Sequence, residues 1–306
     1  MKASRGQPSF SIASVERDTG ISKDTLRVWE RRYDFPLPLR DQHGERVYTQ
    51  DQVEKLRTIK RLLDLGYRPG KIVGRSIEEL EALTEPDVGD ARAQPVSHAH
   101  RVVVDLVKQH RVAELRLELG QAVMRQGLAP FLIDTVAPIN TAIGEAWMRG
   151  QLEIFEEHLY TETLQGVLRS AIAAIPQPGG APRVLLTTFP NEQHNLGLLM
   201  AEAMFAIEGA SCISLGTQTP LFDIVLAAAS HHADIVALSF SAAHPSNHVL
   251  EGLEELRAKL PPAIALWAGG RNAALGKRAI AGVTVLSELT KIPTAIADWR
   301  AKRGTA

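Results

Sequence analysis

The sequence contains a single cysteine, Cys212, so the chain cannot form an internal disulfide. Cys212 lies in a short apolar stretch that is typical of a strand, and we expect it to be a small core residue rather than a redox thiol. The sequence has no run of about 18 uncharged apolar residues, and residues 1–7 lack the apolar stretch of an export signal. These absences exclude a disulfide scaffold and predict a cytoplasmic chain with no membrane partner.

The motifs of several enzyme classes are absent as well. The sequence has no Walker loop for nucleotide phosphates, no G-x-S-x-G nucleophile and no zincin motif. His231, His232, His244 and His248 are not accompanied by cysteines at the spacing of a zinc site, and we expect all four on the surface. We therefore predict that the chain is not an enzyme.

Charge is distributed unevenly along the 306 residues, although the formal net charge is only -1. Residues 1–75 carry 16 Lys and Arg against 10 Asp and Glu, and the remaining residues carry 18 against 25. A basic first part suits phosphate contacts, whereas the acidic remainder has no charge-based reason to lie on DNA. A solvated charged face would give the same composition, so charge alone leaves both interpretations open.

The basic part has the pattern of a winged helix-turn-helix. Gly20 ends a short predicted helix over residues 12–19, and Ser22 caps a second helix that runs to about Tyr33. A helical period of 3.6 places four residues of this second helix on one face, namely Asp24, Arg27, Val28 and Arg31. Prolines then stop the helix, residues 40–48 predict a two-stranded wing that turns near Gly44, and a long amphipathic helix is predicted over residues 51–65.

Three segments of this part resemble the MerR family of transcriptional regulators, namely Thr25–Tyr33, Gly44–Tyr48 and Leu62–Tyr67. The resemblance implies that residues 1–83 form a winged helix-turn-helix domain that binds double-stranded promoter DNA. In the manner of the family, Arg27 and Arg31 are expected to enter the major groove, and Arg46 and Tyr48 to contact backbone phosphates. The expected DNA-binding set is completed by Lys23, Thr25 and Arg40.

The middle of the chain predicts a linker followed by helices. Residues 84–100 are polar, contain proline and glycine and have no apolar period, as a linker does. Over residues 101–176 apolar residues recur at helical spacing, with breaks near Gly127 and Gly150. This pattern predicts a bundle of four helices.

Residues 177–306 alternate short apolar runs with helical patterns, which predicts an α/β domain with an open, parallel, doubly wound sheet of flavodoxin-like type. Five strands are predicted, over residues 183–188, 210–215, 234–239, 263–267 and 283–286. Ligands bind such sheets beyond the carboxyl ends of the strands, and five polar or small residues fall there, namely His194, Ser239, Ser241, Gly269 and Gly270.

Three patterns at these strand ends together resemble the cobalamin-binding fold, namely E-x-H-x-x-G over residues 192–197, S-x-S over residues 239–241, and Gly269-Gly270. A neutral imidazole is a good axial ligand for cobalt, so the resemblance makes His194 the metal ligand, with Glu192 orienting it. Gly197, Ser239, Ser241, Gly269 and Gly270 are expected to accommodate the nucleotide tail. On the residues alone, His194 could still be an ordinary loop histidine, and the paired glycines an ordinary tight turn.

Trp147 and the pair Glu157-His158 flank the Gly150 break in the helical part. Without other knowledge, Trp147 is a core residue and His158 a surface histidine. The spacing W-x9-E-H, however, resembles the helical cap of the light-sensing MerR-type repressors of the CarH and LitR group. The resemblance implies that Trp147 packs on the adenosyl group of adenosylcobalamin, that Glu157 and His158 bond to its polar edge, and that Ile154 lines the same pocket.

This resemblance implies a cobalamin-dependent, light-responsive repressor that binds promoter DNA in the dark as a dimer or tetramer and is released by photolysis. The sequence departs from the motifs at three positions: Glu192 stands where Asp is usual, Ser241 where Leu is usual, and Met148 where some members carry a histidine. Two alternatives stay open. One is a MerR-type regulator whose sheet domain binds heme, another tetrapyrrole or a protein partner, and the other is a corrinoid enzyme subunit, which has no need of residues 9–75.

Overall fold

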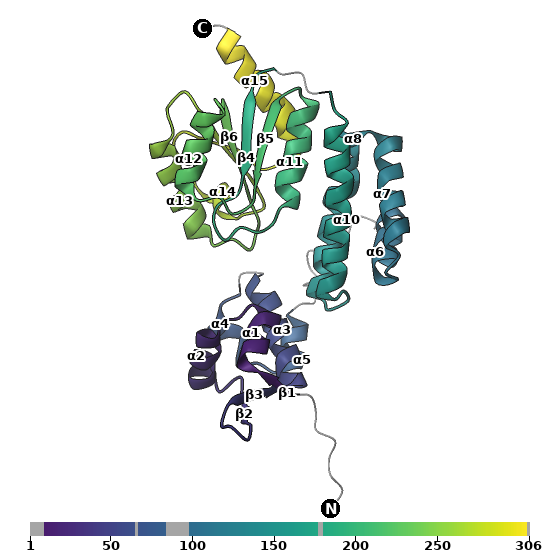
Figure 1. The fold of residues 1–306 in the computed structure, drawn as a ribbon, viewed down its shortest axis with the longest axis vertical. Coiled ribbons are helices and arrows are strands. Elements are labelled where there is room, and N and C mark those ends of the chain that lie inside the picture. The colour runs from purple at the N-terminus through teal and green to yellow at the C-terminus, as the bar shows by residue number, and fades with distance from the viewer. Residues whose placement is uncertain (1–8, 65–66, 84–97, 177–179, 305–306) are drawn as a thin grey trace, which may run out of the picture. The chain divides into compact units, whose positions relative to one another are not determined.

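The computed structural model describes residues 9–64, 67–83, 98–176 and 180–304 (Figure 1). The chain divides into two compact units, of which the first comprises Met1–Gln94 and Glu145–Leu152, and the second Pro95–Gly144 and Glu153–Ala306. The predicted order of a winged helix-turn-helix, a helical region and a five-stranded parallel sheet is confirmed. Within the described residues, no helix has the length and apolar character that a bilayer span requires.

The first unit begins with the predicted helix-turn-helix. Helix α1 (Ile12–Thr19) has Ser11 as its N-cap, and Gly20 ends it with a φ of 68°. Helix α2 (Lys23–Tyr33) has Ser22 as its N-cap, and the Ser22 side chain accepts a hydrogen bond from the Thr25 N–H. Capping oxygens satisfy N–H groups that have no partner inside a helix, which fixes where both helices start.

The wing of the first unit has one strand more than predicted. Strand β3 (Arg46–Thr49) pairs antiparallel with β2 (Leu39–Arg40) and also with β1 (Ser9–Ser11). Three helices follow, namely α3 (Gln50–Asp64), α4 (Pro69–Ile72) and α5 (Ile77–Ala82). Their apolar faces share a core with the helix-turn-helix, built around Val15, Leu26, Trp29, Leu56 and Leu62.

The second unit opens with helices. They are α6 (His98–Lys108), α7 (Val112–Gln126), α8 (Leu128–Pro130), a π-helical turn over Phe131–Val136, α9 (Ala137–Met148) and α10 (Ile154–Ala173). The last residues of α9 belong to the first unit. Gly127 marks a predicted break and has a φ of 80°. A further break lies at His110, whose φ is 56°. Helix α6 starts inside the predicted linker, of which residues 84–97 lie outside the described part.

The rest of the second unit is a parallel sheet with helices on both faces (Figure 1). The five strands are β4 (Arg183–Thr187), β5 (Ser211–Gly216), β6 (Ile235–Phe240), β7 (Ala265–Gly270) and β8 (Val283–Leu286), in the order β5-β4-β6-β7-β8. Helices α12 (Leu221–Ser230) and α13 (Ser246–Lys259) lie on one face, and α11 (Leu196–Ile207) and α15 (Ile292–Gly304) on the other. The short α14 (Ala274–Lys277) and a 3-10 turn over Leu289–Lys291 complete the domain.

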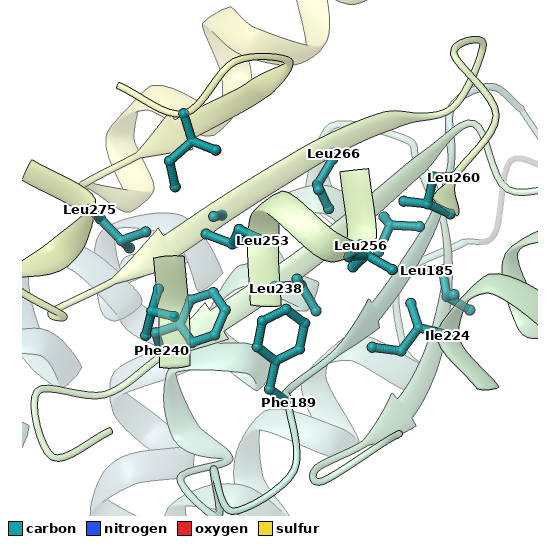
Figure 2. Close-up of a cluster of buried hydrophobic side chains, with 14 of the residues drawn as sticks. Leu185, Phe189, Ile224, Leu238, Phe240, Leu253, Leu256, Leu260, Leu266 and Leu275 are labelled. Carbon is teal, nitrogen blue, oxygen red and sulfur yellow. The ribbon is translucent and has the colours of Figure 1, made fainter. Parts of the chain in front are cut away.

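Apolar side chains fill the space between the sheet and the α12–α13 face (Figure 2). Leu185 and Leu238 point from neighbouring strands toward Leu253 and Leu256 of α13, and Phe189 meets Phe240 edge to face with 5.1 Å between ring centroids. Every residue of β6 is buried, which explains why residues 235–238 of this strand form an unbroken apolar run in the sequence. The core therefore holds the carboxyl ends of β4 and β6 in fixed positions.

We expect Gly270→Ala to destabilise the protein by about 2–4 kcal/mol. Gly270 has a φ of 111°, and a Cβ there would lie 2.1 Å from the Phe240 carbonyl oxygen, which belongs to the neighbouring strand. Gly276→Ala is the matched control, because a Cβ at that position meets nothing within 4 Å and alanine favours a helix. Urea unfolding followed by circular dichroism measures both variants, and equal stabilities would contradict the predicted clash.

Candidate cofactor site and DNA-binding face

A cavity of about 500 Å³ opens at the carboxyl ends of the strands. It lies where β4 and β6 are neighbours although β5 separates them in the chain, which is the position at which doubly wound sheets bind ligands. Its wall is mostly apolar and includes Leu186, Phe205, Ala237, Trp267 and Ala268. All the polar and glycine residues predicted from the strand ends except Glu192 line this cavity, namely His194, Gly197, Ser239, Ser241, Gly269 and Gly270.

His194 presents an exposed ring whose orientation is fixed by Glu192. The side chain is 63% exposed, and its Nδ1 lies 2.7 Å from Glu192 Oε1. The His194 backbone N–H donates to the same carboxylate oxygen at 3.1 Å. With Nδ1–H donating to a carboxylate, Nε2 becomes the nitrogen that can serve as a metal ligand.

Glu192 is a buried carboxylate, with 1% of its side chain exposed. Burial raises the pKa of Glu192, but hydrogen bonds from the His194 side chain, the backbone N–H groups of Ser241 and His194, and the Ser241 hydroxyl outweigh it and lower the pKa to about 2. Both Ser241 donors lie 2.8 Å from Oε2. The carboxylate is thus ionised at neutral pH. The Ser241 hydroxyl, which was expected to bond to the nucleotide tail, donates to Glu192 in this structure.

His244 also faces Glu192, and the prediction that it lies on the surface is wrong. Its side chain is 2% exposed, and its Nδ1 lies 3.9 Å from Glu192 Oε2. Burial lowers the pKa of His244, although the Glu192 charge opposes this shift, so the ring is neutral. Within the described part of the chain Nδ1 has no hydrogen-bond partner. Only the long-range packing of β6 against β4 could have revealed this position.

The glycines of the site lie at close approaches to neighbouring atoms. A Cβ on Gly197 would lie 3.0 Å from the Ser239 hydroxyl oxygen, and one on Gly269 would lie 2.9 Å from the Leu286 carbonyl oxygen. Together with Gly270, they keep the edge of the sheet open beside His194. A cradle of this kind, next to one imidazole and an apolar cavity, fits a large flat ligand with a metal centre and an apolar appendage.

The helical region contributes a wall that the sequence did not suggest. Ile133 of the π-helical turn, with Ala137 and Asn140 of α9, lines the cavity. The Tyr160 hydroxyl donates to Asn140 Oδ1 at 2.7 Å, and burial, with a smaller effect of Glu157, raises the pKa of Tyr160 so that the hydroxyl stays protonated. Asn140 was missed because nothing in its local sequence distinguishes it from an ordinary polar helix residue.

Three of the expected cap residues, which belong to the same unit as the cavity, do not line it in this structure. Ile154, Glu157 and His158 lie in the first turns of α10, where His158 Nδ1 is 3.0 Å from Glu157 Oε2. Glu157 also accepts a hydrogen bond from the Thr161 hydroxyl at 2.7 Å. Trp147 belongs to the first unit and His194 to the second. Their roles toward a ligand stay predictions.

The expected DNA-binding residues of the first unit are mostly accessible. Arg31 is exposed, Arg27 pairs with Asp24 at 3.1 Å on the same face of α2, and Arg40 donates to the Gly44 carbonyl at 2.7 Å. The hydroxyl of Thr25 is 2.8 Å from that of Ser22, and Lys23 pairs with Glu16 at 3.4 Å.

Two wing residues differ from this expectation. Tyr48 is 1% exposed and packs in the core, so the predicted phosphate contact of its hydroxyl is wrong for this structure. Arg46 is half-buried and pairs with Glu30 at 2.9 Å, which raises the pKa of the guanidinium. A phosphate contact by Arg46 therefore has to compete with Glu30.

Comparison with known proteins agrees with this arrangement. Residues 10–74 match the MerR HTH family regulatory protein model, and residues 182–286 match the B12 binding domain model. The HTH-type transcriptional repressor CarH of Myxococcus xanthus is 30% identical over 87% of this chain and 90% of its own length. The chain belongs to the CarH and CarA family of transcriptional repressors.

One further relative and one solved structure are similar to this chain. The HTH-type transcriptional repressor CarA of Myxococcus xanthus is 31% identical over 86% of this chain and 88% of its own length. The monomethylamine corrinoid protein of Methanosarcina barkeri shares the fold of 64% of this chain and 96% of its own, with a TM-score of 0.52 at 14% identity. This member of the CarH and CarA family is thus a regulator rather than an enzyme, with a B12-binding domain after its DNA-binding domain.

We expect Glu192→Gln to lower the free energy of unfolding by roughly 2–3 kcal/mol at pH 7. The pKa of Glu192 is about 2 in the folded protein, below its usual 4.5, so the carboxylate stabilises the fold above pH 4.5. That contribution is lost as pH falls toward 2. Urea unfolding at pH 7, 4 and 3 should show that the difference in the free energy of unfolding between parent and variant becomes smaller as the pH falls.

Glu254→Gln is the control for this series, because Glu254 is a half-exposed carboxylate that pairs with Arg278 on the surface. Its effect should be small at every pH. If the difference in the free energy of unfolding between the parent and Glu192→Gln stays constant down to pH 3, the stabilising charge does not reside on Glu192.

Proposed function

We propose that this protein is a light-responsive transcriptional repressor that binds promoter DNA in darkness with adenosylcobalamin bound, and that leaves the DNA after illumination. The observation that carries the proposal is the His194–Glu192 pair at the mouth of an apolar cavity, in a chain that also has a MerR-type domain. The family membership supports the repressor part of the proposal, and the cavity supports the cofactor part.

His194 would hold the cobalt through Nε2, and Glu192 would keep Nδ1 protonated and make the imidazole a stronger ligand. Gly197, Ser239 and Gly269 would accommodate the nucleotide tail, with the Ser239 hydroxyl as a hydrogen-bonding group. When bound, adenosylcobalamin supplies a cobalt–carbon bond that light cleaves.

In this proposal Trp147, Ile154, Glu157 and His158 hold the adenosyl side of the cofactor and thereby fix one arrangement of the helical region. That arrangement would let copies of the chain associate as a dimer or tetramer, so that several DNA-binding domains act together and gain from avidity. A change from nearly full to nearly empty promoter occupancy requires a bias of about 5.5 kcal/mol, which the loss of cooperative binding can supply.

We expect His194→Ala to lose most of its cobalamin binding, by about tenfold or more, because the axial ligand is removed. The parent, mixed with adenosylcobalamin in darkness and desalted, should keep a corrinoid absorbance spectrum that changes irreversibly under green light. His231→Ala, which removes an exposed histidine distant in sequence, serves as the control.

A His194→Ala protein that responds to adenosylcobalamin and light like the parent would refute the ligand assignment. A colourless parent would refute the cofactor itself and would favour a regulator whose sheet domain binds another tetrapyrrole or a protein partner.

We expect Arg31→Ala to weaken binding to duplexes selected by the parent from a random library, by about tenfold or more at fixed salt. Arg31 is exposed on α2, on the face expected to enter the major groove. Arg278→Ala is the control, since Arg278 is equally cationic but lies in the sheet domain and pairs with Glu254. Equal affinities of the Arg31→Ala variant and the parent in a gel-shift titration would exclude this role.

A further inference from the structure

Arg271 is the only arginine or lysine among the described residues that line the cavity. It follows Gly269-Gly270 at the end of β7, and its backbone N–H donates to the Phe240 carbonyl at 2.9 Å. Because Gly270 approaches that same carbonyl too closely for any side chain, the turn that delivers Arg271 has little freedom to shift. The backbone therefore places this one strong cation at the mouth of the cavity.

The charge of Arg271 is held by a neutral partner. Its Nη2 donates to the Thr141 hydroxyl at 2.8 Å, and Thr141 in turn donates to the Ala137 carbonyl at 3.1 Å. No carboxylate among the described residues pairs with Arg271. Glu288, which also lines the cavity, lies 3.8 Å from Lys291 instead. The guanidinium is thus oriented by α9 but keeps an uncompensated positive charge.

We propose that Arg271 binds the phosphodiester of the corrinoid's nucleotide tail, and so selects corrinoids that carry a complete tail. The inference rests on the proposed function, because it requires a corrinoid in this cavity. It goes further by assigning the anionic group of the ligand to one residue, outside the patterns that identify the cavity.

The chemistry of the tail matches the two parts of the cavity. The tail of cobalamin ends in an aromatic base, which suits the apolar wall formed by Leu186, Phe205 and Trp267. Between the corrin ring and that base lies one phosphodiester, which carries one negative charge. A planar guanidinium binds phosphate oxygens with two parallel hydrogen bonds, whereas a hydroxyl such as that of Thr141 offers it only one neutral acceptor. Exchange of Thr141 for the phosphodiester would therefore be favourable.

Two corrinoids separate this role from a general effect on the cavity. Cobalamin carries the phosphodiester, and cobinamide lacks both the phosphodiester and the base. We expect Arg271→Gln in the full chain to bind cobalamin about tenfold or more weakly than the parent, and cobinamide within about twofold of it. Binding is measured by absorbance titration in darkness, at low and at high salt. Added salt should weaken cobalamin binding by the parent more than by Arg271→Gln.

Two control variants accompany the titrations. Arg278→Gln removes an equal charge from a surface pair with Glu254 and should bind both corrinoids like the parent. Thr141→Val removes the neutral partner of Arg271 but leaves its charge, and should bind cobalamin at least as tightly as the parent.

Equal losses of both corrinoids in Arg271→Gln would overturn the inference and give Arg271 a structural role at the cavity. Unchanged cobalamin binding, or the same salt dependence in parent and variant, would also overturn it. A parent that binds neither corrinoid would overturn the proposed function itself, and this outcome is distinct from the others because it appears before any variant is compared.

Discussion

One buried carboxylate connects the two strands that frame the cavity. Glu192 follows β4 and Ser241 follows β6, and four hydrogen bonds from Ser241 and His194 converge on the two oxygens of Glu192. A buried charge is tolerated only when it is fully hydrogen-bonded. Removal of any one donor would therefore leave the Glu192 carboxylate incompletely hydrogen-bonded and destabilise the site. The position of the exposed imidazole thus depends on a group that does not itself line the cavity.

The main features of the sheet domain could be predicted from the sequence because they follow from local patterns. Buried parallel strands are apolar runs, as in β6, and the parallel arrangement then brings the ends of β4, β6 and β7 to one edge. The patterns did not show which partner each polar side chain has. Ser241 bonds to Glu192, and His244 is buried beside the same carboxylate, because the folded sheet brings together residues about 50 positions apart.

The errors in the other domains have the same origin. Tyr48 was expected to contact DNA phosphates in the manner of the family, but it pairs with Phe10 of β1, a strand of three residues that is too short to be recognised in the sequence. The helix break at His110 was missed because a non-glycine residue there has a left-handed conformation, whereas the break at Gly127 follows from residue type. Local signals thus predicted the elements, and long-range contacts decided which faces are buried.

The π-helical turn over Phe131–Val136 gives one wall of the cavity room for an extra residue. A π turn closes its hydrogen bonds one residue later than an α turn, so it contains a residue that a regular helix would omit. Deletion of one residue within the turn would restore a regular helix and leave the helical residues on either side facing as they do now. The same deletion in the regular part of α9 would rotate the residues after it by about 100°. Because Ile133 lies inside the turn and Asn140 after it, a single-codon deletion in the turn would remodel the Ile133 part of the wall and leave Asn140 in place.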